Sequence, residues 1–291
     1  MRATQLSEAI RFSQKDYPSV ISDPLILVGY EIEFIAPLDR AINPNQAHNK
    51  IVKQQIPLLL TKIKQDLSLP VKFDAPSSEV IGGSWSLVQD GTIEPNQPEQ
   101  ELGWELISPP LPIAQALHYL QKIFSWMQEN RYYTNNTCGF HVNVSYGDRT
   151  QSADPLKLIL LLGEKYLADL FDRVSNEFTA SHIQALKSKI RKKPQIVLTA
   201  DTDVVQLKNQ LRKMLSKEKN YTVNLGKQAK KGYLEFRIAG GQHYHQRWQE
   251  ILNLILRYAF VVKASLDPHS FEREYAEELA NLIIQTKSQE V

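Results

Sequence analysis

The chain has a single cysteine, Cys138, and no long uninterrupted apolar run among its 291 residues. One cysteine cannot form an intrachain disulfide, which fits a reducing compartment. The longest apolar stretch, around 251–262, is broken by Asn253 and Arg257, so it falls short of the roughly 18 residues that span a bilayer. The first residues also lack the apolar core of a secretory signal. We therefore expect a soluble, cytoplasmic protein that does not enter membranes.

The chain also lacks a strong net charge. Its formal net charge of +2 argues against a nucleic-acid-binding protein. The segment Lys187–Lys231 is an exception, with 13 Lys and Arg against 3 Asp and Glu. This basic segment is either a solvated helix face or a surface for an anionic ligand, such as a nucleoside triphosphate or an acidic protein partner. The length and the 42% hydrophobic fraction allow one large domain or two small ones.

Several short segments alternate apolar and polar side chains. The polar positions between apolar neighbours are Glu31 and Glu33, Glu101 and Glu105, His141 and Asn143, and Glu235 and Arg237. A period of two predicts half-buried strands. Exposed sheet faces usually have Thr, Ser and Lys, whereas these positions are mostly acids, His and Arg. If the strands share one sheet, the carboxylates gather and repel one another, and a divalent cation is the usual partner that neutralises them.

Strands and helices alternate along the chain in blocks. We predict strands over 25–36, 85–88, 102–107, 140–145, 221–225 and 233–239, and helices over 46–67, 112–130, 244–266 and 271–287. The segment from Asp154 to about residue 217 has a helical pattern, with Asp154 as a cap and Pro155 in the first turn. Pro57 should kink or split the first of these helices. Strands on both sides of a helical insert predict an α+β fold with one mixed sheet.

The paired acids and the histidine are the main candidates for chemistry. On a strand, Glu31 and Glu33 lie on the same face about 6–7 Å apart, so they can bind two ions or bridge one. The alternative is a solvent-facing pair of acids. His141 and Asn143 share a polar face that suits a metal or phosphate contact, although a lone His beside apolar residues is often purely structural. Asp90, Glu94 and Glu105 are further acids around a turn, and Glu105 is the least loop-like.

Glu235 and Arg237 repeat this geometry with opposite charges. The acid suits a metal, and the guanidinium fork suits a phosphate or carboxylate. The alternative is a simple ion pair. We interpret His243 and His245 as cap-region or surface histidines and Cys138 as a packing residue. Walker, dinucleotide-binding and hydrolase-elbow motifs are missing from the sequence.

The order of these motifs resembles the amidoligase family, a branch of the glutamine synthetase-like carboxylate–amine ligases. The matching segments are Gly29–Glu33, Asp90–Glu94, Glu105–Leu111, Gly139–Val144, Val223–Asn224 and Leu234–Arg237. The resemblance implies a curved, mainly antiparallel sheet with a polar concave active-site face, backed by helices. It also implies a single catalytic domain over 1–291, with a helical insert at about 154–217 and C-terminal helices at about 244–287.

The resemblance further implies an ATP-dependent ligase that activates a carboxylate as an acyl phosphate, which an amine then attacks to form an amide. The implied cofactors are ATP and Mg²⁺ or Mn²⁺. Glu31, His141 and Glu235 would hold the metal at the ATP phosphates. Glu33 and Glu105, with Asp90, would hold the metal nearer the acyl substrate. Arg237 would stabilise the transferring phosphoryl group, and Asn143 and Asn224 would contact the nucleotide.

One departure affects the polar face. The family strand often has His-x-His, whereas this chain has Asn143 at the second position, and Asn does not titrate near neutral pH. The expected partners are a carboxylate, such as glutamate or a peptide or protein carboxylate, and an amine. Two other functions fit the same residues. One is a metal-dependent phosphohydrolase or nuclease, and the other is a non-catalytic binding or assembly protein that keeps the fold.

Overall fold

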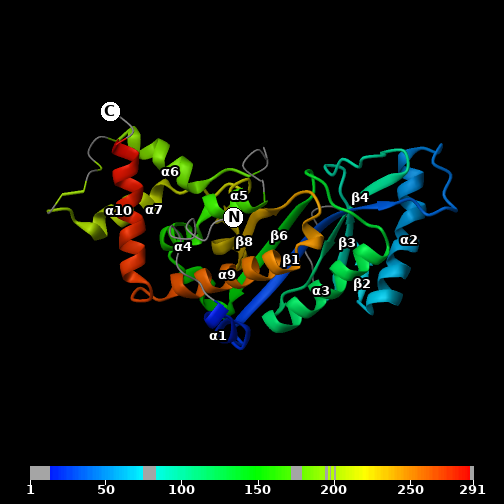
Figure 1. The fold of residues 1–291 in the computed structure, drawn as a ribbon, viewed down its shortest axis with the longest axis horizontal. Helices are drawn as coiled ribbons and strands as arrows, with labels where there is room; N and C mark the ends of the chain where they lie inside the picture. Colours follow the sequence, from blue (N-terminus) through cyan, green and yellow to red (C-terminus); the bar gives the residue numbers. More distant parts are fainter. Residues whose placement is uncertain are drawn as a thin grey trace. The chain divides into compact units, whose positions relative to one another are not determined.

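The computed structural model describes residues 14–74, 83–171, 179–193, 196, 198–199 and 201–288. Two compact units divide the chain. The sheet unit comprises Leu27–Asn143 and Ala239–Leu254, and the helical unit comprises Met1–Ile26, Val144–Ile238 and Ile255–Val291. Strands β6 (Gly139–Tyr146) and β8 (Leu234–Gly240) and helix α9 (Trp248–Leu266) contribute residues to both units (Figure 1). The prediction of a single domain over 1–291 stays a prediction.

The sheet unit is built around a long central strand. Its strands are β1 (Ile26–Pro37), β2 (Val71–Phe73), β3 (Trp85–Gln89), β4 (Glu101–Ile107) and β5 (Leu111–Pro112), with parts of β6 and β8. They lie in the order β2-β3-β4-β1-β6-β8, with β5 also paired to β1. The pairs β3–β4, β4–β1 and β5–β1 are antiparallel, and β2–β3 is parallel. The predicted α+β class with a mixed, mostly antiparallel sheet is confirmed.

The two helices of the sheet unit are α2 (His48–Leu67) and α3 (Ile113–Glu129). The aromatic side chains of α3 face the sheet. The Phe124 ring packs edge-on against the rings of Phe140 and Tyr244, with centroids 6.0 and 5.9 Å apart. Trp126 packs in the same way against Phe34 of β1. Helix α3 therefore covers the apolar face of β1 and β6, and strand alternation directs the intervening polar side chains to the other face.

Pro57 does not split its helix, which was one of the two outcomes predicted from the sequence, and a kink at Pro57 stays a prediction. Helix α2 is 20 residues long and continues without a break through Pro57. Proline removes one N–H and therefore one helical hydrogen bond. Ile51, Leu59 and Ile63 are nevertheless buried along one side of α2. Because tertiary packing of such a stripe supplies most of a helix's stability, it outweighs the local cost of the proline.

The segment predicted as a helical insert, about 154–217, contains several short helices. They are α4 (Pro155–Leu162), α5 (Glu164–Phe171), α6 (His182–Arg191) and α7 (Val204–Met214), and α8 (Gly226–Lys231) follows outside the predicted bounds. The helical unit also has α1 (Tyr17–Ile21), α10 (Glu272–Ser288), strand β7 (Val223–Asn224), which pairs antiparallel with β8, and short 3₁₀ turns. None of the helices that the structure describes combines enough length and apolarity to cross a membrane.

Polar groups satisfy both ends of the buried helix α4. The Asp154 carboxylate accepts hydrogen bonds from the N–H groups of Leu156 and Lys157, and Pro155 occupies the first turn, as predicted. At the other end, the Arg257 guanidinium donates to the carbonyl of Leu162 at 2.7 Å. Because the helix is apolar on all sides, these terminal groups would otherwise be buried without partners.

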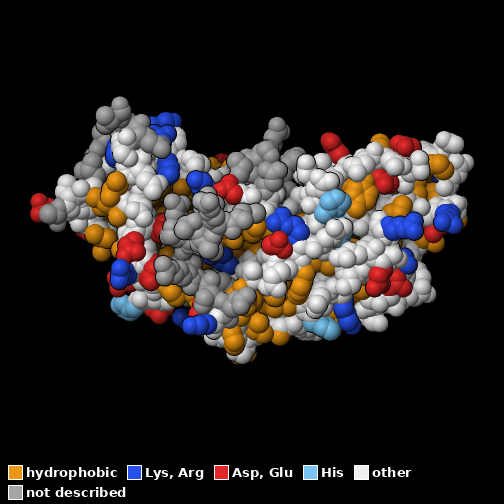
Figure 2. Space-filling model, viewed as in Figure 1, with side chains coloured by type: hydrophobic (Ala, Val, Ile, Leu, Met, Phe, Trp, Pro, Cys, Tyr) orange, Lys and Arg blue, Asp and Glu red, His pale blue; other side chains and the backbone are white. Residues whose placement is uncertain are grey.

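The basic segment Lys187–Lys231 covers part of α6 and all of α7 and α8. Some of its cations already have partners within the helical unit. Lys189 Nζ donates to the carbonyl of Met214 at 2.6 Å, and Arg212 forms an ion pair with Asp154. On the face shown in Figure 2, positive and negative side chains are interspersed. An acidic protein partner for this segment stays a prediction.

His245 is buried, which corrects its interpretation as a cap-region or surface histidine. Only 1% of the residue is exposed, and its Nδ1 lies 3.3 Å from the hydroxyl of Thr134. Burial, followed by the charge of neighbouring His243, lowers the pKa of His245 from 6.5 to about 4. The sequence missed this because the residue lies in a turn, where burial depends on packing rather than on periodicity.

The buried His245 predicts a loss of stability in acid. As pH falls below 6.5, the unfolded chain gains a proton at this residue that the folded chain does not accept until about pH 4. The free energy of unfolding should therefore decrease across this window, by up to roughly 3 kcal/mol from this group. Urea unfolding of His245→Gln should show a shallower pH dependence than the wild type.

The exposed His269 provides a matched control, because its side chain is 87% exposed. His269→Gln should keep the wild-type dependence on pH. If His245→Gln and the wild type lose equal stability between pH 7 and pH 4.5, burial of a neutral His245 is not the cause of the acid sensitivity.

Candidate functional site: an acid–histidine group on the sheet

Three strands of the sheet unit bring two acids and a histidine together. Glu33 of β1 is the direct cross-strand partner of Glu105 of β4. His141 of β6 lies beside them. Each of these three residues offers one ligand atom, and the three atoms lie within 4.8 Å of one another. Glu33 and His141 are buried, and Glu105 is half-buried. Like charges directly opposite each other destabilise a sheet, so this acid–histidine group needs a compensating positive charge.

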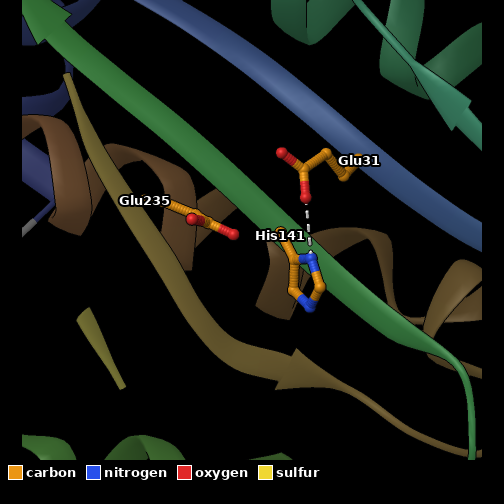
Figure 3. Close-up of side chains that lie close together, drawn as sticks. All are labelled: Glu31, His141 and Glu235. Atoms are coloured by element: carbon orange, nitrogen blue, oxygen red, sulfur yellow. Dashed lines mark hydrogen bonds and ion pairs between the residues drawn. The ribbon is translucent and has the colours of Figure 1, made fainter. Parts of the chain in front are cut away.

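A hydrogen bond to Glu31 orients the ring of His141. His141 Nδ1 lies 2.9 Å from Glu31 Oε2. The dashed line in Figure 3 marks this hydrogen bond. Glu31 also accepts a hydrogen bond from Asn143 Nδ2 at 3.1 Å. A carboxylate acceptor places the proton of a neutral imidazole on Nδ1, which leaves the lone pair on Nε2. This arrangement is common behind metal-ligating histidines, where the carboxylate fixes both the tautomer and the ring orientation.

The Nε2 atom of His141 faces Glu33 across a gap. The distance from Nε2 to Glu33 Oε1 is 3.9 Å, which is too long for a hydrogen bond. Two ligands on one cation, each bound at 2.0–2.6 Å, lie roughly 3–4 Å apart. The spacing therefore fits a shared ion.

The backbone of Gly139 and the side chain of Tyr244 hold Glu33 in place. The N–H of Gly139 donates to Glu33 Oε2 at 2.6 Å, and the hydroxyl of Tyr244 donates to the carbonyl of Glu33 at 2.7 Å. Sequence reasoning missed both residues. A glycine two positions before a candidate ligand is a signal of close backbone approach, and a Cβ at Gly139 would lie only 2.7 Å from His141 Nε2. For Tyr244 the sequence has no comparable signal.

Among the residues that the structure describes, none donates a hydrogen bond to the side-chain oxygen of Asn143. Asn143 Oδ1 is buried, whereas Nδ2 donates to Glu31. If the Oδ1 and Nδ2 atoms of the Asn143 amide were exchanged, Oδ1 would face the Glu31 carboxylate, and two acceptors cannot form a hydrogen bond. The amide is therefore oriented with Nδ2 toward Glu31. A buried acceptor without a donor is costly. It suits a donor or a cation that binds at this face, as a Mg²⁺ or Mn²⁺ ion would.

Glu235 and Arg237 belong to the helical unit and form an ion pair there. Asn224, the cross-strand partner of Glu235, donates to its other oxygen at 2.7 Å. Only 3% of Glu235 is exposed, and Arg237 is half-buried. The ion pair that the sequence left open as an alternative is therefore present. Figure 3 also labels Glu235.

The predicted loop acids have different surroundings. Asp90 Oδ1 accepts hydrogen bonds from the N–H and the hydroxyl of Thr92, at 2.8 and 2.7 Å. This Asx turn stabilises the loop, and within the described chain Asp90 is not a member of the acid–histidine group. Glu94 is exposed and lines a polar cavity of the sheet unit.

Comparison with known families identifies the class of protein. Residues 25–259 match the family described as "Putative amidoligase enzyme". The match covers more than half of the chain, so the chain belongs to this amidoligase family, as the motifs predicted. The family description agrees with a ligase in general terms. No curated protein matches the chain.

The close approach at Gly139 predicts a sensitive position. In Gly139→Ala the new methyl group would lie 2.7 Å from His141 Nε2 and 3.1 Å from Glu33 Oε1, so the ring and the carboxylate must move apart. We expect Mn²⁺ binding, measured by titration calorimetry, to weaken at least about tenfold, as when groups that support metal ligands are lost.

Gly91→Ala is the matched control, because a Cβ there would meet nothing within 4 Å. It should bind Mn²⁺ as the wild type does. Equal Mn²⁺ affinity for Gly139→Ala and Gly91→Ala would show that the acid–histidine group does not hold the ion.

Proposed function

We propose that the chain is an ATP-dependent carboxylate–amine ligase that requires Mg²⁺ or Mn²⁺. The reaction would activate a carboxylate as an acyl phosphate, and an amine would then displace phosphate to form an amide. The observation that carries the proposal is the group of Glu33, Glu105 and His141 in a chain of the amidoligase family. Glutamate and peptide carboxylates are the first substrates to test.

The polar face of the sheet unit fits a divalent cation. Glu33, Glu105 and His141 Nε2 would hold it, and the unpaired oxygen of Asn143 is an additional neutral donor. Glu31 would orient His141 through its hydrogen bond to Nδ1. We leave Asp90 out, since the Asx turn uses its Oδ1. A bound cation would neutralise phosphate and acyl oxygens as negative charge shifts between them.

The remaining assignments follow the family resemblance. We assign Glu235 to an ion beside the ATP phosphates and Arg237 to the transferring phosphoryl group. An Arg suits this position because its planar fork binds two phosphate oxygens at once. Its ion pair with Glu235 fixes the guanidinium before any nucleotide binds. Asn224, which donates to Glu235, would keep that carboxylate in place.

Mg²⁺ and ATP should bind together and stabilise the fold. ATP without metal should raise the melting temperature only weakly, because its phosphates would meet uncompensated carboxylates. A ligand at a hundredfold excess over its dissociation constant stabilises the native state by about 2.7 kcal/mol. Thermal scans with Mg²⁺, ATP and both together test this prediction. A melting temperature that does not respond to millimolar Mg-ATP would favour the non-catalytic alternative.

Glu33→Gln removes one charge from the acid–histidine group but keeps the volume of the side chain. Without metal the variant should be at least as stable as the wild type, because a repulsion with Glu105 is lost. ADP release with Mg-ATP, glutamate and ammonium should fall at least about a hundredfold, as expected when a metal ligand is lost.

The exposed Glu129 on α3 provides the control, and Glu129→Gln should retain both stability and activity. A Glu33→Gln enzyme with normal turnover and normal Mn²⁺ affinity would rule out Glu33 as a ligand. A variant that loses stability instead would identify Glu33 as a structural acceptor for Gly139.

A further inference from the structure

A polar cavity of about 390 Å³ lies in the sheet unit. Three segments form its wall: a loop around Glu94 and Asn96, the loop Tyr133–Thr137, and the turn at Gln242 and His243. Amide and hydroxyl groups make up most of the lining. None of the described residues that line this cavity is Lys or Arg.

Besides Tyr133, the ionisable side chains in the described lining of the cavity are Glu94 and His243. Burial, and then the hydrogen bond to Glu101, raise the pKa of Tyr133 to about 12, so its phenol stays neutral. Glu94 is the only acid among the described residues of the lining. Its side chain forms no ion pair or hydrogen bond within the described chain.

The backbone of Glu94 is held firmly on both sides. Its N–H donates to the hydroxyl of Thr137 at 3.0 Å, and its carbonyl accepts from Asn135 Nδ2 at 2.7 Å. Asn135 Oδ1 in turn accepts from the N–H and the hydroxyl of Thr137. These bonds use the backbone of Glu94 and the side chains of Asn135 and Thr137 for the structure of the loop, and the Glu94 carboxylate takes part in none of them.

The chain connects this cavity directly to the acid–histidine group. Thr137 in the cavity wall is two residues from Gly139, so their Cα atoms are at most roughly 7 Å apart. Gly139 donates to the Glu33 carboxylate, and Tyr244, next to His243, donates to the Glu33 carbonyl. Two walls of the cavity are therefore attached to the residue that we propose as a metal ligand.

We propose that this cavity is the amine subsite and that Glu94 binds the amine as its ammonium cation. The inference rests on the proposed ligase function and names the amine as a small, positively charged primary amine or ammonium. An ammonium group presents several N–H donors, and a carboxylate with surrounding amide and hydroxyl oxygens satisfies them. Charge assistance makes such hydrogen bonds stronger than those between neutral groups.

Other ligands fit the cavity less well. A carboxylate substrate or the ATP phosphates would meet Glu94 with no Lys or Arg in the described wall to compensate. A tightly held divalent cation needs six or more oxygen ligands and usually several carboxylates, whereas this lining has one. An adenine ring is neutral and gains nothing from the carboxylate.

Binding of a probe amine tests the subsite without turnover. Methylammonium chloride is titrated into the full chain, with potassium chloride as the ionic control, and ¹³C-methylammonium shifts are followed. Glu94→Gln should bind methylammonium about ten- to a hundredfold more weakly, which is the usual effect of losing a charged hydrogen-bond partner. Glu99→Gln, an exposed acid on the same loop but outside the cavity wall, should bind as the wild type does.

Steady-state kinetics then separate the amine from the other substrates. With Mg-ATP and glutamate, Glu94→Gln should raise the KM for methylamine by about the same factor as its binding constant. The KM for ATP and the KM for hydroxylamine, which is uncharged at neutral pH, should change little. Glu99→Gln should change none of these constants. The melting temperature of Glu94→Gln should match that of the wild type, which excludes misfolding as the cause.

The outcomes separate this inference from the ligase proposal. Wild-type turnover combined with an unchanged methylamine KM in Glu94→Gln overturns the amine subsite and leaves the ligase intact. A raised KM for ATP in Glu94→Gln would instead identify a nucleotide pocket. Methylammonium binding that depends on Glu94, without ADP release from any carboxylate, supports the subsite and counts against the ligase. Equal methylammonium affinity in Glu94→Gln and the wild type overturns the subsite whatever the turnover.

Discussion

The repulsion between Glu33 and Glu105 is the constraint on which the sheet unit depends. Strand alternation directs Tyr30, Ile32 and Phe34 into the core, where all three are almost fully buried. The same alternation forces the intervening glutamates to the opposite face, and the register of β1 with β4 sets Glu33 directly across from Glu105. A register shift would relieve the repulsion but would expose the core residues, so the fold maintains the acids in place.

A backbone group and an aromatic side chain hold Glu33 in this arrangement. Gly139 supplies an N–H to the Glu33 carboxylate, and Tyr244 bonds the carbonyl of the same residue. The Tyr244 ring also packs against Phe124 and Phe140, which fixes its hydroxyl. Neutral donors position a carboxylate without cancelling its charge. The bond from Gly139 therefore leaves Glu33 with its charge, whereas in the helical unit Glu235 has a guanidinium partner.

Sequence periodicity predicted most of the elements but few of their contacts. The period-two segments correspond to β1, β4, β6 and β8, and the helix cap at Asp154 and the first-turn position of Pro155 are confirmed. Strands β2 and β5 have only three and two residues, too few for a period to be recognisable. Burial of His245 and the bond between Glu31 and His141 arise from packing between distant segments, which no local pattern encodes. The motif order, in contrast, identified the family.

The replacement of a second histidine by Asn143 has a consequence for charge. A neutral amide next to Glu31 adds an oxygen donor without adding negative charge or a titrating group. The acid–histidine group already includes two carboxylates around one neutral imidazole nitrogen. If further acids were added to this group, they would cancel most of the positive charge of a cation bound there. Such a cation would then attract anionic substrates only weakly. Asn143 Nδ2 donates to Glu31, and within the described chain Asn143 Oδ1 has no hydrogen-bond partner. Under the proposed function, this one side chain would supply both an orienting bond and a neutral oxygen for a cation, without weakening the attraction of that cation for phosphate.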